Sequence, residues 1–117
     1  MRMVLALALM TGAAKAETDC LAAGAGPCTA AADTAVAIQN DLPEDVPHMR
    51  LMFAIAGGRS VVVGAVPALG GAMPDPADAA AYLCRHATAR AYVDGGGRIE
   101  VLLHDKTLLD LTTCEAP

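Results

Sequence analysis

Four cysteines constrain the fold of this chain of 117 residues more than any other feature. They are Cys20, Cys28, Cys84 and Cys114. An even number of cysteines in a short exported chain is typical of disulfides, and four cysteines allow three connectivities. Because no two of them are spaced as Cys-x-x-Cys, neither a zinc knuckle nor a thioredoxin-type redox motif is indicated. We expect the pairs Cys20–Cys28 and Cys84–Cys114.

The N-terminal segment has the pattern of a secretory signal. Arg2 gives it a positive start, residues 3–10 are apolar, and an Ala-Lys-Ala sequence supplies a cleavage point. The apolar run is shorter than the roughly 18 residues of a membrane-spanning helix. We therefore predict a signal peptide over residues 1–16 and one exported domain over residues 17–117. Many alanines, glycines and arginines with few lysines indicate a G+C-rich bacterium, and so a periplasmic or secreted protein.

The charge and the aromatic content limit the partners and the size of the core. Removal of the signal leaves six Lys and Arg against thirteen Asp and Glu. Nucleic acid and anionic membranes would repel such a chain, so we expect neither nucleic-acid binding nor stable membrane insertion after cleavage. The three aromatic residues are Phe53, Tyr82 and Tyr92. Since alanines bury little area, disulfides are expected to add stability to a small core.

Hydrophobic periodicity predicts four structural units. They are a helix that begins near Thr29, a hairpin over residues 48–66, a helix over residues 76–93 and a hairpin over residues 98–114. This order indicates a small α+β domain with the order helix, hairpin, helix, hairpin. We expect a four-stranded antiparallel sheet with both helices on one face, stapled by the disulfides.

The apolar alternation within each hairpin predicts which side chains enter the core. In the first hairpin, these are Met49, Leu51, Phe53 and Ile55. In the second hairpin, we expect Leu103 to pair with Leu109 across a turn with an odd number of residues. That register places Glu100 and Asp110 together on the opposite, solvent-facing side of the sheet.

The stretch "AYLCRHATARAY" places a thiol two residues from an imidazole. On a helix, positions two apart point about 200° away from each other, so Cys84 and His86 cannot share a ligand or a proton. We expect Cys84 to face inward toward Cys114 and His86 to face outward. The chain has no Gly-x-Ser-x-Gly sequence and no phosphate-binding loop, and we predict that it is not an enzyme and needs no cofactor.

One helix face has the composition of an interaction surface. Tyr82, His86 and Arg90 follow one another at intervals of four, with Arg85 and Tyr92 nearby. Tyrosine and arginine are typical anchors of protein interfaces, although a solvated helix face gives the same pattern. The sequence therefore favours a non-enzymatic protein that acts through protein contacts, such as an accessory, assembly or inhibitory factor.

A small-ligand or metal-binding module is the alternative. His48, Met49 and Met52 lie close together in the sequence, and imidazole with thioether suits Cu(I). In a regular strand, however, the two methionines project from opposite faces. Core packing is the simpler interpretation of this segment, and we predict no metal site.

Overall fold

The computed structural model describes residues 26–70 and 72–114. The predicted signal peptide and Cys20 lie outside these residues, so the cleavage point and the Cys20–Cys28 pair stay predictions. The described chain contains these elements in order: α3 (Gly26–Gln39), β1 (Glu44–Val46), β2 (Met49–Gly57), β3 (Ser60–Pro67), α4 (Pro76–Arg85), α5 (Ala87–Asp94), β4 (Arg98–Leu103) and β5 (Lys106–Leu111).

The sheet is mixed and has five strands, in the order β1-β2-β3-β4-β5. The prediction of four antiparallel strands was therefore wrong in two respects. First, β3 and β4 are parallel, from Ser60 beside Arg98 to Ala65 beside Leu103. The connection between β3 and β4 contains α4 and α5. A connection of this length can carry the chain back to the same end of the sheet and so produce a parallel pair.

The second difference is strand β1, which lies between the predicted helix that begins near Thr29 and the predicted hairpin over residues 48–66. It pairs with β2 through Val46 opposite Met49, and both side chains are buried. The turn between them places His48 at a φ of 65°. A strand of three residues is too short to show the alternation on which a prediction depends.

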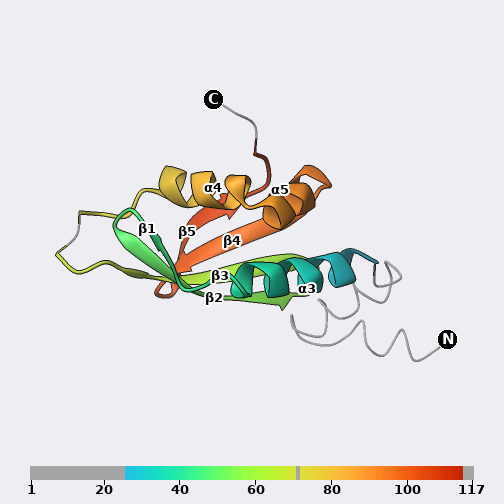
Figure 1. Ribbon diagram of the computed structural model, residues 1–117, viewed down its shortest axis with the longest axis horizontal. Coiled ribbons are helices and arrows are strands. Elements are labelled where there is room, and N and C mark those ends of the chain that lie inside the picture. The colour runs from blue at the N-terminus through green and yellow to red at the C-terminus, as the bar shows by residue number, and fades with distance from the viewer. Residues whose placement is uncertain (1–25, 71, 115–117) are drawn as a thin grey trace.

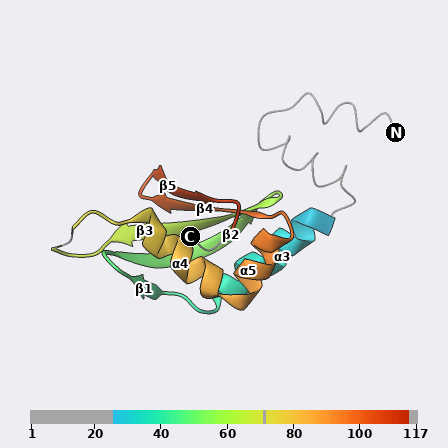
Figure 2. The same cartoon turned by 90° about the horizontal axis from the view of Figure 1, so that it is seen from above.

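The three described helices share one core with the sheet. α3 lies along β2 and β3, while α4 and α5 lie over β5 and β4 (Figure 1). Figure 2 shows α5 beside α3, so that the helices form one layer. In α3, Ala31, Ala35 and Ile38 follow the helical period on one face and are all buried, whereas Leu42, the fourth residue of the same apolar spacing, lies after the helix and is partly buried. All three described helices cover the same face of the sheet, where the sequence predicted two helices on one face.

The helix predicted over residues 76–93 is two helices. It begins as expected, with the Asp75 side chain accepting a hydrogen bond from the Ala77 N–H and with Pro76 at the first position. The chain then breaks at His86, which has an extended conformation (φ −77°, ψ 115°). Because the break changes the direction of the second half, its buried side chains are Ala89 and Val93.

Two β-bulges change the faces of the hairpins. In β2 the register shifts between Leu51 and Phe53, so Met52 is the extra residue. Met49 and Leu51 are buried as expected, but Phe53 and Ile55 are exposed on the other face of the sheet. The core prediction for these two residues was wrong because one extra residue exchanges the faces of all that follow.

In the last hairpin, a second bulge offsets the effect of a turn length that differs from the predicted one. Leu103 pairs with Lys106 across a two-residue turn, so the expected pair of Leu103 with Leu109 and the odd turn length were wrong. The register shifts between Val101 and Leu102, so that Leu102 pairs with Thr107 and Val101 pairs with Leu109. Glu100 therefore lies opposite Asp110, on the face away from the helices, as predicted.

Candidate functional site

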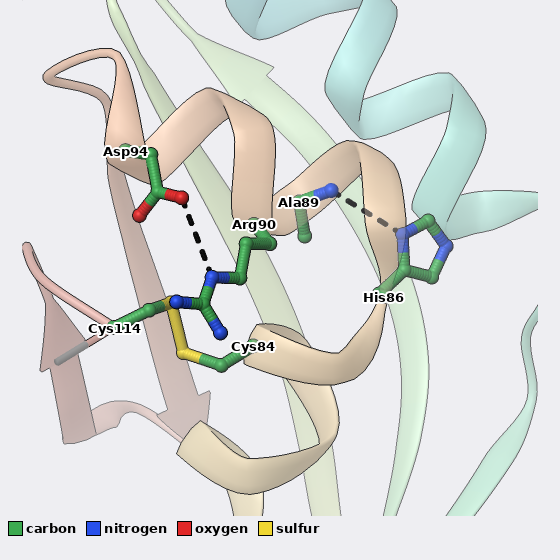
Figure 3. Close-up of a disulfide and its surroundings, with 6 residues drawn as sticks. All are labelled: Cys84, His86, Ala89, Arg90, Asp94 and Cys114. Atoms are coloured by element: carbon green, nitrogen blue, oxygen red, sulfur yellow. Dashed lines mark hydrogen bonds and ion pairs between the residues drawn. A yellow bond between two sulfur atoms is a disulfide. The ribbon is translucent and has the colours of Figure 1, made fainter. Parts of the chain in front are cut away.

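Cys84 of α4 and His86, at the junction of α4 and α5, have separate structural roles. Cys84 forms a disulfide with Cys114, with the Cα atoms 5.6 Å apart. This bond joins α4 to the end of the last strand, as predicted. In Figure 3 the imidazole of His86 projects away from the sulfur atoms, on another side of the helix junction. The pair is therefore not a reactive centre.

The sequence predicted that His86 faces the solvent, but the structure places it between the helices. Its side chain is only 11% exposed. The ring Nδ1 accepts a hydrogen bond from the Ala89 N–H at 3.3 Å and so caps α5 (Figure 3). The other nitrogen, Nε2, lies 2.6 Å from Oδ2 of Asp41, just after α3. Because Nδ1 accepts, Nε2 carries the proton that it shares with Asp41. The imidazole therefore holds α3, α4 and α5 together.

The break at His86 disperses the expected interaction face. Arg90 pairs with Asp94 at 3.3 Å along α5. Tyr92 points elsewhere, and its hydroxyl donates to the backbone carbonyl of Arg59 in the β2–β3 turn at 2.6 Å. Its ring packs so closely over Gly97 that a Cβ there would lie 2.5 Å from the ring. Burial raises the pKa of Tyr92. These contacts are structural.

Part of the expected face remains around Tyr82. Its ring meets His86 edge to face, with centroids 6.2 Å apart. Burial raises the pKa of Tyr82, and the nearby carboxylates of Glu44 and Asp41 raise it further. The hydroxyl is buried without a hydrogen-bond partner in the described part of the chain. A cavity of about 390 Å³ adjoins this cluster and is also lined by the exposed Arg85.

The structure does not bring the three candidate copper ligands together. Met49 is 1% exposed and packs in the core, whereas Met52 is 42% exposed on the opposite face. His48 lies in the exposed turn before β2. Over residues 26–70 and 72–114, no group of three His, Cys, Asp or Glu side chains is placed to hold a metal ion. In the same residues, no helix is long and apolar enough to cross a membrane.

An apolar surface lies on the face of the sheet opposite the helices. The bulge at Met52 turns Phe53 and Ile55 onto this face, where they are 45% and 54% exposed. Across the strands, Phe53 pairs with Gly64, and Ile55 pairs with Val62. We call this surface the open-face patch and define it as Met52, Phe53, Ile55, Val62, Val66 and Leu102.

Phe53 fills a gap at the centre of the patch. Its ring lies over Gly64, where a Cβ atom would be 2.1 Å from the ring carbon Cε2. Gly64 also pairs with Leu102 of β4, so Phe53 and Leu102 flank the glycine from both sides. An aromatic ring over a strand glycine replaces the packing that the glycine lacks. The open-face patch is thus continuous over three strands.

Charged pairs border the open-face patch at its two ends. At the β1 end, Arg50 pairs with Asp45 at 2.7 Å. Toward β5, the Arg98 guanidinium makes two hydrogen bonds to Asp110, of 2.6 and 2.9 Å. These bonds lower the pKa of Asp110 and raise the pKa of Arg98. Glu100 accepts a hydrogen bond from the Thr107 hydroxyl. The border is therefore polar and internally satisfied, with apolar side chains between its ends.

The sequence does contain a signal for this surface. In the run from Met49 to Ala56, all residues except Arg50 are apolar, so both the odd-numbered and the even-numbered positions of the strand carry apolar side chains. β3 has the same pattern. A strand with one solvated face normally alternates apolar with polar residues. The lack of alternation indicates that both faces carry apolar side chains, whatever the register.

No family model and no curated protein sequence matches this chain. The fold is similar to that of two solved structures. One is the type II secretion system pilotin AspS from Vibrio cholerae, at 19% identity and a TM-score of 0.52, over 73% of this chain and 85% of that chain. The other is the pilotin EpsS of the Vibrio vulnificus type 2 secretion system, at 19% identity and a TM-score of 0.55, over 78% and 94%. The likeness shows a shared fold.

Proposed function

We propose that this protein is a small exported accessory factor without enzymatic activity, which binds another protein of the bacterial envelope. Its task on this proposal is the assembly of an envelope complex, in the manner of the two pilotins that share its fold. The observation that carries the proposal is the open-face patch. Large exposed apolar patches on small proteins are typical of interaction surfaces.

The polar groups support binding over catalysis. Catalysis needs acid, base or nucleophile groups that converge on a space a substrate can enter. Here Asp45, Asp110 and Asp41 are each engaged by a basic side chain of the same domain. Cys84 of α4 is oxidised in a disulfide with Cys114. The open-face patch, by contrast, consists of exposed or half-buried apolar side chains that no described element covers.

The open-face patch replaces the helix face that the sequence favoured. Arg85 and Arg90 are exposed, but His86 and Tyr92 are engaged in contacts that hold the fold. Sequence periodicity had placed the anchors of a partner on this helix. We now place them on β2 and β3, where aromatic and aliphatic side chains are exposed together. Periplasmic location and the signal peptide over residues 1–16 belong to the same proposal.

Affinity capture with paired variants tests this function. The wild-type protein, Ile55→Ser and the control Val36→Ser would be used in parallel on detergent extracts of the bacterial envelope. Val36 is 60% exposed on α3 and so matches Ile55 in exposure but not in location. We expect one envelope protein to be recovered with the wild type and the control and to be lost with Ile55→Ser.

Two results would count against the proposal. One is recovery of the same proteins with all three forms. The other is a small molecule that remains bound to the purified protein in native mass spectrometry, which would favour the ligand-binding alternative. If the partner is found, deletion of this protein should also lower the amount of the assembled partner complex in the envelope.

A further inference from the structure

His86 is the capping residue of two consecutive helices. Its backbone N–H donates to the carbonyls of Tyr82 and Leu83 at the end of α4. Its ring Nδ1 accepts from the N–H of Ala89, the third residue of α5. The first turn of a helix leaves several N–H groups without a partner in the helix, and a side-chain acceptor satisfies one of them. The start of α5 therefore depends on a nitrogen atom that can take up a proton.

Protonation of the imidazole removes this acceptor. A neutral imidazole has one donor and one acceptor nitrogen, whereas both nitrogens of the charged form are donors. In the charged form, the Nδ1–H of His86 would face the Ala89 N–H at a distance between the nitrogens of 3.3 Å, and the two donors would repel each other. The positive charge would also lie at the N-terminus of α5, where the helix dipole disfavours it.

The groups around the ring favour the charged form in spite of this cost. They are Asp41 after α3, Glu44 of β1, Tyr82 and Arg85 of α4, and Arg90 of α5. Nε2 lies 2.6 Å from the Asp41 carboxylate, and a hydrogen bond to a carboxylate is stronger when the donor is also charged. In Figure 3 the guanidinium of Arg90 extends toward Asp94 and lies apart from the ring. Protonation therefore removes the cap of α5 and strengthens the contact with Asp41.

The sequence supplies a second cap for α5 two residues further along. Thr88 is the exposed second residue of α5, and threonine is among the preferred N-caps of helices. If α5 began at Ala89, the Thr88 hydroxyl could accept from the N–H of one of the next residues of the shortened helix. Ala89 and Val93, the buried side chains of α5, would stay within it. The shorter helix can therefore keep the packing of the longer one.

We propose that His86 switches the start of α5 when its imidazole takes up a proton. With a neutral ring, α5 begins at Ala87 and Nδ1 caps it. With a charged ring, α5 begins at Ala89 and Thr88 caps it, while the ring stays bound to Asp41. Imidazoles in proteins commonly change charge between about pH 5 and 8, which is the range in which the switch acts. The inference is independent of the proposed function, because it uses no residue of the open-face patch.

NMR of the labelled purified protein between pH 8 and pH 5 tests the switch. The ring nitrogen shifts of His86 report its protonation, and the Cα shifts of Ala87 and Thr88 report whether these residues are helical. We expect both Cα shifts to move from helical toward extended values with the same midpoint as the ring. The hydrogen-exchange protection of the Ala89 amide, corrected for the intrinsic pH dependence of exchange, should fall by about five- to tenfold, the equivalent of one typical N-cap.

Three variants assign the transition to its parts. Asparagine is a preferred N-cap that does not titrate in this range, so His86→Asn should keep the Ala87 start at both pH values. Asp41→Asn removes the carboxylate that favours the charged ring, so the midpoint of the transition should move to lower pH. His104→Gln is the matched control, because His104 lies in the exposed turn between β4 and β5. It should leave the transition unchanged.

The wild-type titration decides the proposal even if a variant fails to fold. The inference is wrong if the His86 ring stays neutral down to pH 5. It is also wrong if the ring takes up a proton while the Ala87 and Thr88 shifts and the Ala89 protection stay constant. A transition that persists in His86→Asn would assign the pH dependence to another group and would equally overturn the role of His86.

Discussion

Gly64→Ala should destabilise the wild-type protein but stabilise the Phe53→Ala variant. In the wild type, a Cβ at position 64 would lie 2.1 Å from the Phe53 ring, so Gly64→Ala must displace the ring. In the Phe53→Ala background the space is open, and alanine is the better strand residue. The prediction is specific to the bulged register, because Phe53 would not contact Gly64 if its side chain entered the core.

The magnitude follows from the exposure of Phe53, which is 45%. Full burial of a phenylalanine contributes up to about 3 kcal/mol, so roughly half of its surface contributes about 1–1.5 kcal/mol. Alanine is more favourable than glycine within a strand by about 0.5–1 kcal/mol. Gly64→Ala should therefore destabilise the wild type by about 0.5 kcal/mol and stabilise Phe53→Ala by about 0.5–1 kcal/mol. The coupling free energy is about 1–1.5 kcal/mol.

Urea unfolding of the wild type, both single variants and the double variant measures this coupling. Gly57→Ala is a matched control, because a Cβ there would meet only Val62 Cγ2, at 4.0 Å. Its effect should be the same with and without Phe53. If Gly64→Ala also has equal effects in the two backgrounds, within about 0.5 kcal/mol, then the ring does not cover Gly64 and the placement of Phe53 is wrong.

Three further predictions concern the Cys84–Cys114 disulfide, the Tyr92 hydroxyl and the ion pair of Arg98 with Asp110. The double variant Cys84→Ala, Cys114→Ala opens a loop with a sequence separation of 30, and urea unfolding should show a loss of about 3–4 kcal/mol; a loss below about 1 kcal/mol would contradict it. Burial raises the pKa of Tyr92, so its contribution to stability is complete below about pH 10 and is lost as the pH rises through the raised pKa. Unfolding measured from pH 8 to 12 should show this loss, and Tyr92→Phe should reduce it. Hydrogen bonds from Arg98 lower the pKa of Asp110, so the ionised carboxylate stabilises the fold above about pH 4, and this contribution disappears as the pH falls through the lowered pKa. Carboxyl NMR should show the Asp110 pKa return toward its ordinary value in Arg98→Gln, and an unchanged titration would contradict the ion pair.

The parts of the fold that the sequence predicted depend on local signals. The stripe of Ala31, Ala35 and Ile38 repeats with the helical period, and its burial is observed. The start of α4 has an aspartate cap and a proline at the first helical position, a combination that favours a helix start. The link between Cys84 and Cys114 followed from an inward-facing cysteine on this helix and another at the end of the last strand.

The parts that the sequence did not predict depend on contacts distant in the chain. The bulge at Met52 cannot be placed in a run that is apolar at both phases, since either register buries a plausible core. The break at His86 depends on Asp41, which lies 45 residues away and binds the imidazole. Pairing of β3 with β4 depends on how the intervening helices pack. The open-face patch is a consequence of the bulge, and periodicity therefore wrongly placed Phe53 and Ile55 in the core.

Site-specific photo-crosslinking in living cells tests the central claim most directly. A benzoylphenylalanine would replace Ile55 on the open-face patch in one strain and Val36 on α3 in another, since both positions are more than half exposed. Irradiation should attach one envelope protein to the Ile55 position and not to the Val36 position. If the Ile55 position gives no adduct, or the two positions give the same adducts, the open-face patch is not the surface through which this protein acts.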